Sequence, residues 1–197
     1  MRLHIGCGQQ AIPGWINVDN QSLPGVDQVL DVRGGLPYSG VDAIYAEHFL
    51  EHLAFEDALA FLVECRRVLA PDGTLRLSTP NLDWVLTTHY RWQDVTPSDR
   101  VADCIKLNRA FHAWGHQFLY NQEMLAAALR SAGFEHVTFH RYGESERAEL
   151  RGLERHERWE ERDGLLHVLV AEARGTGPRE PIPPELLEDF RETMSAR

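Results

Sequence analysis

Histidine and glutamate residues cluster at residues 48–52, which read His-Phe-Leu-Glu-His. An imidazole titrates near neutral pH, so it can accept a proton from a reacting hydroxyl or amine. His48 and His52 are therefore candidate general bases, and the same spacing recurs at His112 and His116. We take His48 and His116 as the catalytic candidates.

The same five residues match H-x-x-E-H, the zinc-binding motif of one class of metallopeptidases. In such an enzyme both histidines lie on one face of a long helix, and a distant acidic residue completes the site. Here the motif follows directly on a strand-like run, and Leu50 and Leu53 are typical of core contacts in a short turn. We therefore expect no metal ligands, and a zinc hydrolase is kept as an alternative hypothesis.

Glycines and an acid mark the ends of two apolar runs near the N-terminus. Leu3–Ile5 enters a turn with Gly6 and Gly8, and the second run ends at Asp19. Open parallel sheets bind nucleosides in the crevice outside the carboxyl ends of their strands. Glycine lets the backbone turn tightly and approach a ligand closely. This pattern predicts a nucleoside site in which the carboxylate accepts hydrogen bonds from the ribose.

Hydrophobic periodicity predicts the elements that position these residues. We expect strands at 2–6, 15–19, 26–32, 41–46, 74–79, 137–142 and 165–173, and helices at 55–69, 82–90 and 122–132. Residues 93–113 are expected to be irregular or helical, and 144–163 to be a solvated helix that supports no specific site. Alternating strands and helices indicate an α/β three-layer fold.

The crossover between the first two strands is too short for an ordinary helix. Residues 6–11 read G-x-G-x-x-A, which formally matches the dinucleotide fingerprint. That fingerprint needs a long helix whose N-terminus binds a pyrophosphate, and Pro13-Gly14 interrupts such a helix. We therefore expect the first crossover helix to be reduced to a turn, and the ligand to be a nucleoside without phosphate.

S-adenosylmethionine is a ligand of this kind. Its sulfonium and ammonium charges suit a crevice edged by Asp19, Asp31 and Glu47.

Five segments support a family resemblance over residues 1–174. In order, they read LHIGCGQQAIPGWINVD, VLDVRGGLP, DAIYAEHFLEHL, RVLAPDGTLRLSTPNL and LAAALRSAGF. Together they resemble the small class I S-adenosylmethionine-dependent methyltransferases of the type 11 kind, and within it a compact subgroup with a GWINVD second strand. The chain departs from the family pattern at Gln9, which replaces the third glycine, and in the turn Pro71-Asp72-Gly73.

The resemblance implies a Rossmann-like, mostly parallel seven-stranded sheet whose last strand is antiparallel. It also implies cofactor-binding roles, with the glycine turn at the methionine part and Asp19 at the ribose hydroxyls. The adenine would lie beside Asp31 and Val32, and two residues after the fourth strand would close the site. These implied cofactor-binding residues are Gly6, Cys7, Gly8, Asp19, Asp31, Val32, Glu47 and His48.

Composition limits the classes of partner. The chain has 197 residues and a formal net charge of −10, which argues against nucleic acids and anionic membranes as partners. Its three scattered cysteines do not indicate a disulfide framework, and no run approaches the roughly 18 apolar residues of a membrane span. We expect a cytoplasmic monomer or homodimer.

The functional hypothesis is an S-adenosylmethionine-dependent methyltransferase that acts on a hydroxyl or amine of a small molecule, such as a sugar or sugar nucleotide. The alternative is a methyltransferase-like domain that binds the cofactor or its product without turnover. We expect residues 1–174 to form the methyltransferase-like domain, followed by a Pro/Gly-rich linker and a short amphipathic helix at 175–197.

Overall fold

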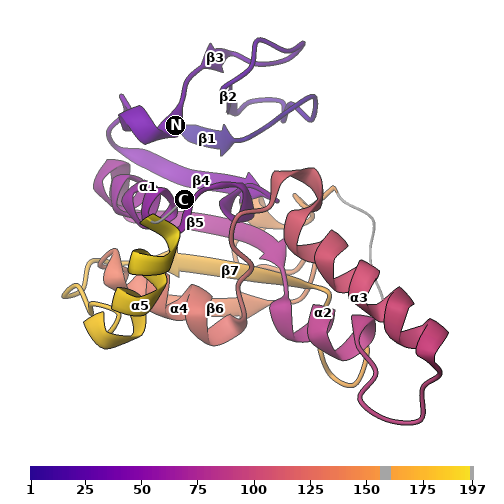
Figure 1. Cartoon of the computed structure of the whole chain (residues 1–197). Coiled ribbons are helices and arrows are strands. Elements are labelled where there is room, and N and C mark those ends of the chain that lie inside the picture. The colour runs from indigo at the N-terminus through magenta and orange to yellow at the C-terminus, as the bar shows by residue number, and fades with distance from the viewer. Residues whose placement is uncertain (156–160, 196–197) are drawn as a thin grey trace.

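One seven-stranded sheet organises the chain, in the order β3-β2-β1-β4-β5-β7-β6 (Figure 1). Strand β7 is antiparallel to both of its neighbours, and the other pairs are parallel. The strands are β1 (Arg2–Ile5), β2 (Ile16–Asp19), β3 (Gln28–Val29), β4 (Val41–Glu47), β5 (Leu69–Pro80), β6 (His136–His140) and β7 (Val168–Arg174). The predicted α/β sheet with its antiparallel last strand is thus confirmed.

The structure is a computed structural model, and it describes residues 1–155 and 161–195. The α-helices are α1 (Phe55–Val68), α2 (Leu82–His89), α3 (Pro97–His112), α4 (Gln122–Ser131) and α5 (Pro184–Ser195). Short 3₁₀ turns are η1 (Val32–Gly34), η2 (Leu50–His52), η3 (Ala113–Gly115) and η4 (Ala148–Leu150). No helix in these two ranges is both long and apolar enough to cross a bilayer.

Helices α1 and α4 pack on one face of the sheet and form the main core. The apolar residues of α1 recur at helical spacing, so that Ala58, Leu62 and Cys65 are all buried against the sheet. Helix α4 begins after a side-chain cap, in which Asn121 Oδ1 accepts from Met124 N at 2.9 Å. Gly133 follows it with a φ of +93°, as a left-handed C-terminal residue requires.

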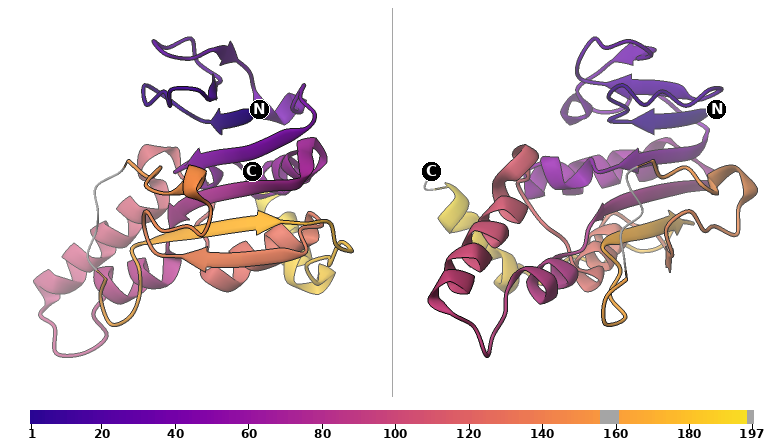
Figure 2. Two further views of the ribbon diagram at one scale, coloured as in Figure 1. Left: turned by 180° about the vertical axis from the view of Figure 1, so that it is seen from behind. Right: turned by 90° about the vertical axis from the view of Figure 1, so that its right-hand side faces the viewer.

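The opposite face is covered by loop segments instead of long helices (Figure 2, left). A smaller apolar cluster there includes Trp15 and Tyr45. Beside it, Arg76 donates to Glu154 at 2.7 Å and to Glu172 at 2.6 Å, and the Arg76 and Glu154 side chains are fully buried.

The expected solvated helix at 144–163 is therefore wrong in its described part. Residues 144–155 contain only the turn η4. Glu154 bonds the buried Arg76, so this stretch packs against the sheet and does not form a solvent-exposed helix. Residues 156–160 lie outside the described residues.

Two sequence expectations near the N-terminus have different outcomes. Residues 6–15, all of them described, form turns and no helix, which confirms the reduced first crossover. The third strand is much shorter than predicted, because the chain leaves the sheet after Val29. Asp31 then caps η1 by accepting from Arg33 N, and such a local side-chain bond competes with a strand.

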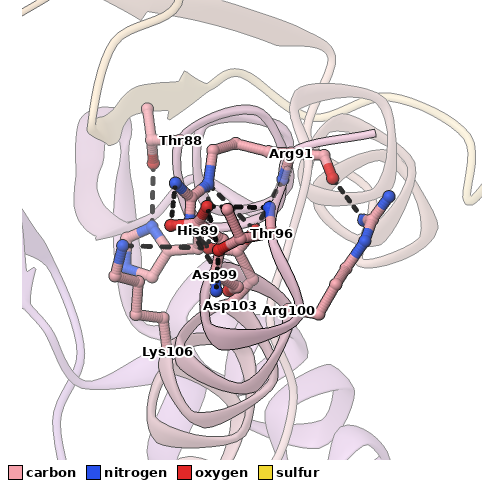
Figure 3. Close-up of polar contacts among 8 residues, drawn as sticks. All are labelled: Thr88, His89, Arg91, Thr96, Asp99, Arg100, Asp103 and Lys106. Carbon is pink, nitrogen blue, oxygen red and sulfur yellow. Dashed lines mark hydrogen bonds and ion pairs between the residues drawn. The ribbon is translucent and has the colours of Figure 1, made fainter. Parts of the chain in front are cut away.

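Helices α2 and α3 form an arm that extends from the carboxyl-terminal end of the sheet (Figure 1). Arg91, in the loop between these two helices, forms ion pairs with α3: its Nη1 is 2.8 Å from Asp99 Oδ1 and its Nη2 is 2.7 Å from Asp103 Oδ1 (Figure 3). Thr96 and Asp99 form a capping box at the start of α3. Residues 93–113, which were expected to be irregular or helical, thus contain a capped helix of 16 residues.

The C-terminal helix α5 packs on the same side as α1. Phe190 makes edge contacts with Phe55 and Phe118 at ring-centroid distances of 6.0 and 5.8 Å. Arg191 also pairs with Glu56, with Nε 2.7 Å from Oε1. The expected C-terminal amphipathic helix is therefore docked on the body of the domain.

Candidate active site

A pocket of about 380 Å³ lies outside the carboxyl ends of β1, β2 and β4. This is the edge at which open α/β sheets bind their ligands, and the volume falls within the roughly 300–1,000 Å³ of small-molecule sites. Its walls are Ile5, Gly6, Val18, Asp19, Asn20, Gln21, Leu30, Asp31, Val32, Arg33, His48, Phe49, His52, Leu53, Ala54, Asp57 and Gln117. The structure thus brings together five of the predicted site residues, namely Gly6, Asp19, Asp31, Val32 and His48.

The glycine turn forms the floor of the pocket under an aromatic ring. Gly6 has a φ of +66°, and a Cβ at this position would lie 2.3 Å from Phe49 Cδ2. Phe49 is itself held by an edge contact with Phe61 at 5.2 Å. Only glycine fits here, for both its backbone conformation and its close approach to the ring.

The Asp19 carboxylate is oriented by two backbone donors. Gly8 N donates to Oδ2 at 2.8 Å, and Gln21 N donates to Oδ1 at 2.9 Å. A carboxylate oxygen has two lone pairs, so each oxygen can accept a further hydrogen bond from a ligand. Gly8 contributes through this bond and is not itself among the pocket walls.

Asp31 and Val32 line the opposite end of the pocket. Asp31 forms a forked pair with Arg33, whose Nε is 2.9 Å from Oδ1 and 3.0 Å from Oδ2. The Arg33 side chain lowers the pKa of Asp31 to about 2, with the Arg33 backbone N–H as the second cause. Asp31 therefore carries its charge at any physiological pH.

Besides Gly8, two more of the predicted cofactor-binding residues, Cys7 and Glu47, are not among the pocket walls. The Cys7 side chain is buried, and burial together with the nearby Asp19 charge raises its pKa to about 11. Glu47 lies on the loop-covered face of the sheet, where its Oε1 accepts from Arg155 N at 2.9 Å. The alternation of β4 explains this placement, because Tyr45 and Glu47 share one face while Ala46 faces the helices.

His48 lies on the pocket wall and is hydrogen-bonded to a buried acid. Its Nδ1 is 2.8 Å from Glu51 Oε1, and the Glu51 side chain is fully buried. Thr79 donates to the other Glu51 oxygen at 2.9 Å. His48 has a φ of +45°, an uncommon conformation for a non-glycine residue that is enriched at functional sites.

His116 is not among the pocket walls, although its neighbour Gln117 is. Its ring lies beside His52 at a centroid distance of 5.1 Å. His112, by contrast, is exposed on α3 and does not join this group. The H-x-x-E-H residues lie in a turn and not in a long helix, as expected.

Sequence reasoning missed several pocket residues. Phe49 could have been suspected from its place between two histidines, but no local pattern shows that its ring covers Gly6. Gln117 enters the pocket because its side chain donates to His52 O at 2.9 Å, a contact across 65 residues. Trp92 and Trp114 are 76% and 67% exposed, and neither residue lines this pocket.

Comparison with solved structures shows the same fold in known proteins. The DhpI–SAH complex aligns with a TM-score of 0.53 at 14% identity, covering 90% of this chain and 77% of DhpI. An S-adenosylmethionine-dependent methyltransferase from Mesorhizobium loti gives 0.52 at 16%, with 88% and 89% covered. PigF with SAH gives 0.51 at 19%, and covers 88% of this chain but only 50% of PigF.

A comparison with curated protein sequences gives no significant match. A family model described as a methyltransferase domain matches residues 13–138. This match includes Asp19, the H-x-x-E-H residues and the whole of α4, and it agrees with the sheet order and the position of the pocket. The chain belongs to this family of methyltransferase domains, and it has the fold of the S-adenosylmethionine-dependent methyltransferases.

Proposed function

We propose that this domain transfers a methyl group to a hydroxyl or amine of a small-molecule acceptor, with His48 as the proton acceptor. The observation that carries the proposal is the His48–Glu51 pair, in which His48 lines the same pocket as Asp19 and the buried Glu51 lies behind it. A base that is oriented by a buried acid beside a ligand pocket is typical of proton-transfer sites.

The residues of the pocket fit S-adenosylmethionine. The Gly6 floor is a cradle that a Cβ would fill, and Asp19 has acceptor capacity for two ribose hydroxyls. Asp31 and Val32 would lie beside the adenine, and Gly6 beside the methionine part. No helix begins at the glycine turn, which agrees with a ligand that carries no phosphate.

S-adenosylmethionine, when bound, supplies a methyl group that its sulfonium has already activated. The task left to the protein is to orient the acceptor and to take its proton. With Nδ1–H donated to Glu51, the His48 ring carries its basic lone pair on Nε2. The buried carboxylate then stabilises the imidazolium that forms when His48 accepts the proton.

The charge around the pocket narrows the acceptor class. Asp19, Asp31 and Asp57 line it, and the cation Arg33 is already paired with Asp31. An anionic acceptor would meet repulsion here. Among sugars, this favours a free sugar over a phosphorylated sugar nucleotide.

The experiment is a methyl-transfer screen with methyl-labelled cofactor against neutral and cationic hydroxyl and amine acceptors. For the acceptor found, His48→Gln should lower kcat by about 10²–10⁴-fold, the usual contribution of a general base, and should lower the affinity for S-adenosylhomocysteine (SAH) much less. His136→Gln on the edge strand β6 is the matched control and should behave as wild type.

Full turnover in His48→Gln would refute the assignment of the base. Tight SAH binding without turnover of any acceptor would favour the non-catalytic alternative.

A further inference from the structure

A cluster of three metal-ligating side chains lies at the rim of the pocket. One potential ligand atom from each of Glu51, His52 and His116 lies within 4.8 Å of the other two. We propose that these residues form a binding site for a divalent transition-metal ion. The site combines two residues of the H-x-x-E-H motif with a histidine 64 positions later in the chain.

Backbone hydrogen bonds hold the two ligand-bearing segments together. Gln117 N and Phe118 N both donate to Glu51 O, at 2.7 and 3.3 Å. The Gln117 side chain donates to His52 O at 2.9 Å. These bonds fix His116 next to His52, so the ligands are positioned before any ion binds.

The His116 ring is oriented as a metal ligand usually is. Its Nδ1 lies 2.8 Å from Ala110 O, so Nδ1 carries the hydrogen and donates to this carbonyl. The lone pair is then on Nε2. Metal-bound histidines almost always donate their other ring N–H to a carbonyl or carboxylate in this way, which fixes both tautomer and orientation.

Glu51 supplies the negative charge of the site. Its side chain is fully buried, and within the described chain it forms an ion pair with His48 but with no arginine or lysine. A buried carboxylate is costly unless a cation and hydrogen bonds compensate for it. Its oxygens accept from His48 and Thr79, and each retains a lone pair for an ion.

Gly115, the residue before His116, lies next to His52 in space. Trp114 and Gly115 have left-handed φ values of +58° and +82°, and a Cβ at Gly115 would lie 3.9 Å from His52 Nδ1, an ordinary contact distance. Ligand bonds of about 2.0–2.2 Å place ligand atoms roughly 3.3–3.5 Å apart, which side-chain rotation can reach from the present separations.

The donor set of two imidazoles and one carboxylate indicates the kind of ion. Imidazole suits zinc, iron and nickel, whereas magnesium prefers oxygen ligands alone. Three protein ligands leave a coordination position open, and His52 lines the pocket. An acceptor oxygen could therefore bind there. This last role rests on the proposed function, but the metal site itself does not.

The test uses the chelator-treated full chain, titrated with Zn²⁺ by calorimetry and with Co²⁺ by visible absorption. We expect one ion per chain and d–d bands of an imidazole-ligated cobalt. His52→Ala and His116→Ala should each weaken Zn²⁺ binding by more than about 100-fold, because loss of a supporting partner alone costs roughly 10–100-fold. His112→Ala is the matched control and should bind as wild type.

Zn²⁺ binding that is unchanged in either ligand variant, or absent from the wild-type chain, would overturn the proposal. Thermal unfolding of each variant shows whether it is folded. An SAH titration on the same samples separates the two hypotheses, since SAH binding without Zn²⁺ binding refutes only the metal site.

Discussion

Replacement of Arg76 by methionine should destabilise the protein strongly. Arg76 lies on β5 beneath the segment that covers the loop side of the sheet, and its guanidinium bonds both Glu154 and Glu172. The exposed fractions of the three side chains are 0%, 0% and 8%. Methionine fills a similar volume but leaves the buried Glu154 carboxylate without its cation, and leaves Glu172 with only the His140 ring, 3.3 Å away.

The loss in the free energy of unfolding can be worked out from the burial of these ion pairs. Removal of one partner from a buried ion pair costs about 3–5 kcal/mol, because the remaining charge is not compensated. For a chain of this length, each kcal/mol shifts Tm by roughly 2–4 °C, so we expect Tm to fall by about 6–20 °C. This is a large share of the roughly 5–15 kcal/mol that keeps a domain folded.

The assay is thermal unfolding followed by circular dichroism at pH 7. Arg174→Met, at the exposed end of β7, is the matched control and should change stability by less than about 0.5 kcal/mol. Adding Glu154→Gln and Glu172→Gln to Arg76→Met should restore part of the lost stability, since it removes the two carboxylate charges that Arg76 had compensated. An Arg76→Met protein within about 1 kcal/mol of wild type would refute the reasoning.

Three further predictions follow from single contacts. Gly6→Ala should weaken SAH binding more than tenfold by calorimetry, because its Cβ would displace Phe49; unchanged affinity would contradict the described floor of the pocket. Burial lowers the pKa of His167 from 6.5 to about 4, so the folded chain binds fewer protons and stability falls as pH drops from 6.5 to 4; His167→Phe should make this fall in Tm shallower. Phe190→Ala should lower the free energy of unfolding by about 1–2 kcal/mol, because it removes half-buried aromatic surface. It should leave SAH affinity intact, as expected if residues 1–174 form the methyltransferase unit.

The sequence predicted the sheet and the floor of the pocket well, because these depend on local signals. Gly6 and Gly8 mark a turn, and Asp19 marks a strand end. The caps of α4 were readable for the same reason, since Asn121 and Gly133 act on their own helix. Helix α3 carries a comparable local signal in Thr96-Pro97-Ser98-Asp99, although its capping box is closed by aspartate instead of the usual glutamate or glutamine.

The contacts that were missed join residues far apart in the chain. Arg76 alternates with leucines, a pattern that normally places a charged side chain in solvent, and its partner Glu154 is 78 residues away. Similarly, nothing in the histidine spacing shows that His116 meets His52, because the hydrogen bonds of Gln117 create that contact. Glu47 was expected at the pocket, but the alternation of side chains along β4 places it on the opposite face of the sheet.

The most direct test of the central claim is calorimetric titration of the wild-type chain and Asp19→Ala with SAH. We predict saturable binding of one SAH to the wild type and at least about 100-fold weaker binding to the variant. Each charge-assisted bond to the ribose contributes about 1.5–3 kcal/mol, and each 1.4 kcal/mol is tenfold in affinity. Asp72→Ala, at an exposed position near the start of β5, is the control and should bind as wild type. Equal SAH affinity in Asp19→Ala and wild type would contradict the assignment of this pocket as the cofactor site.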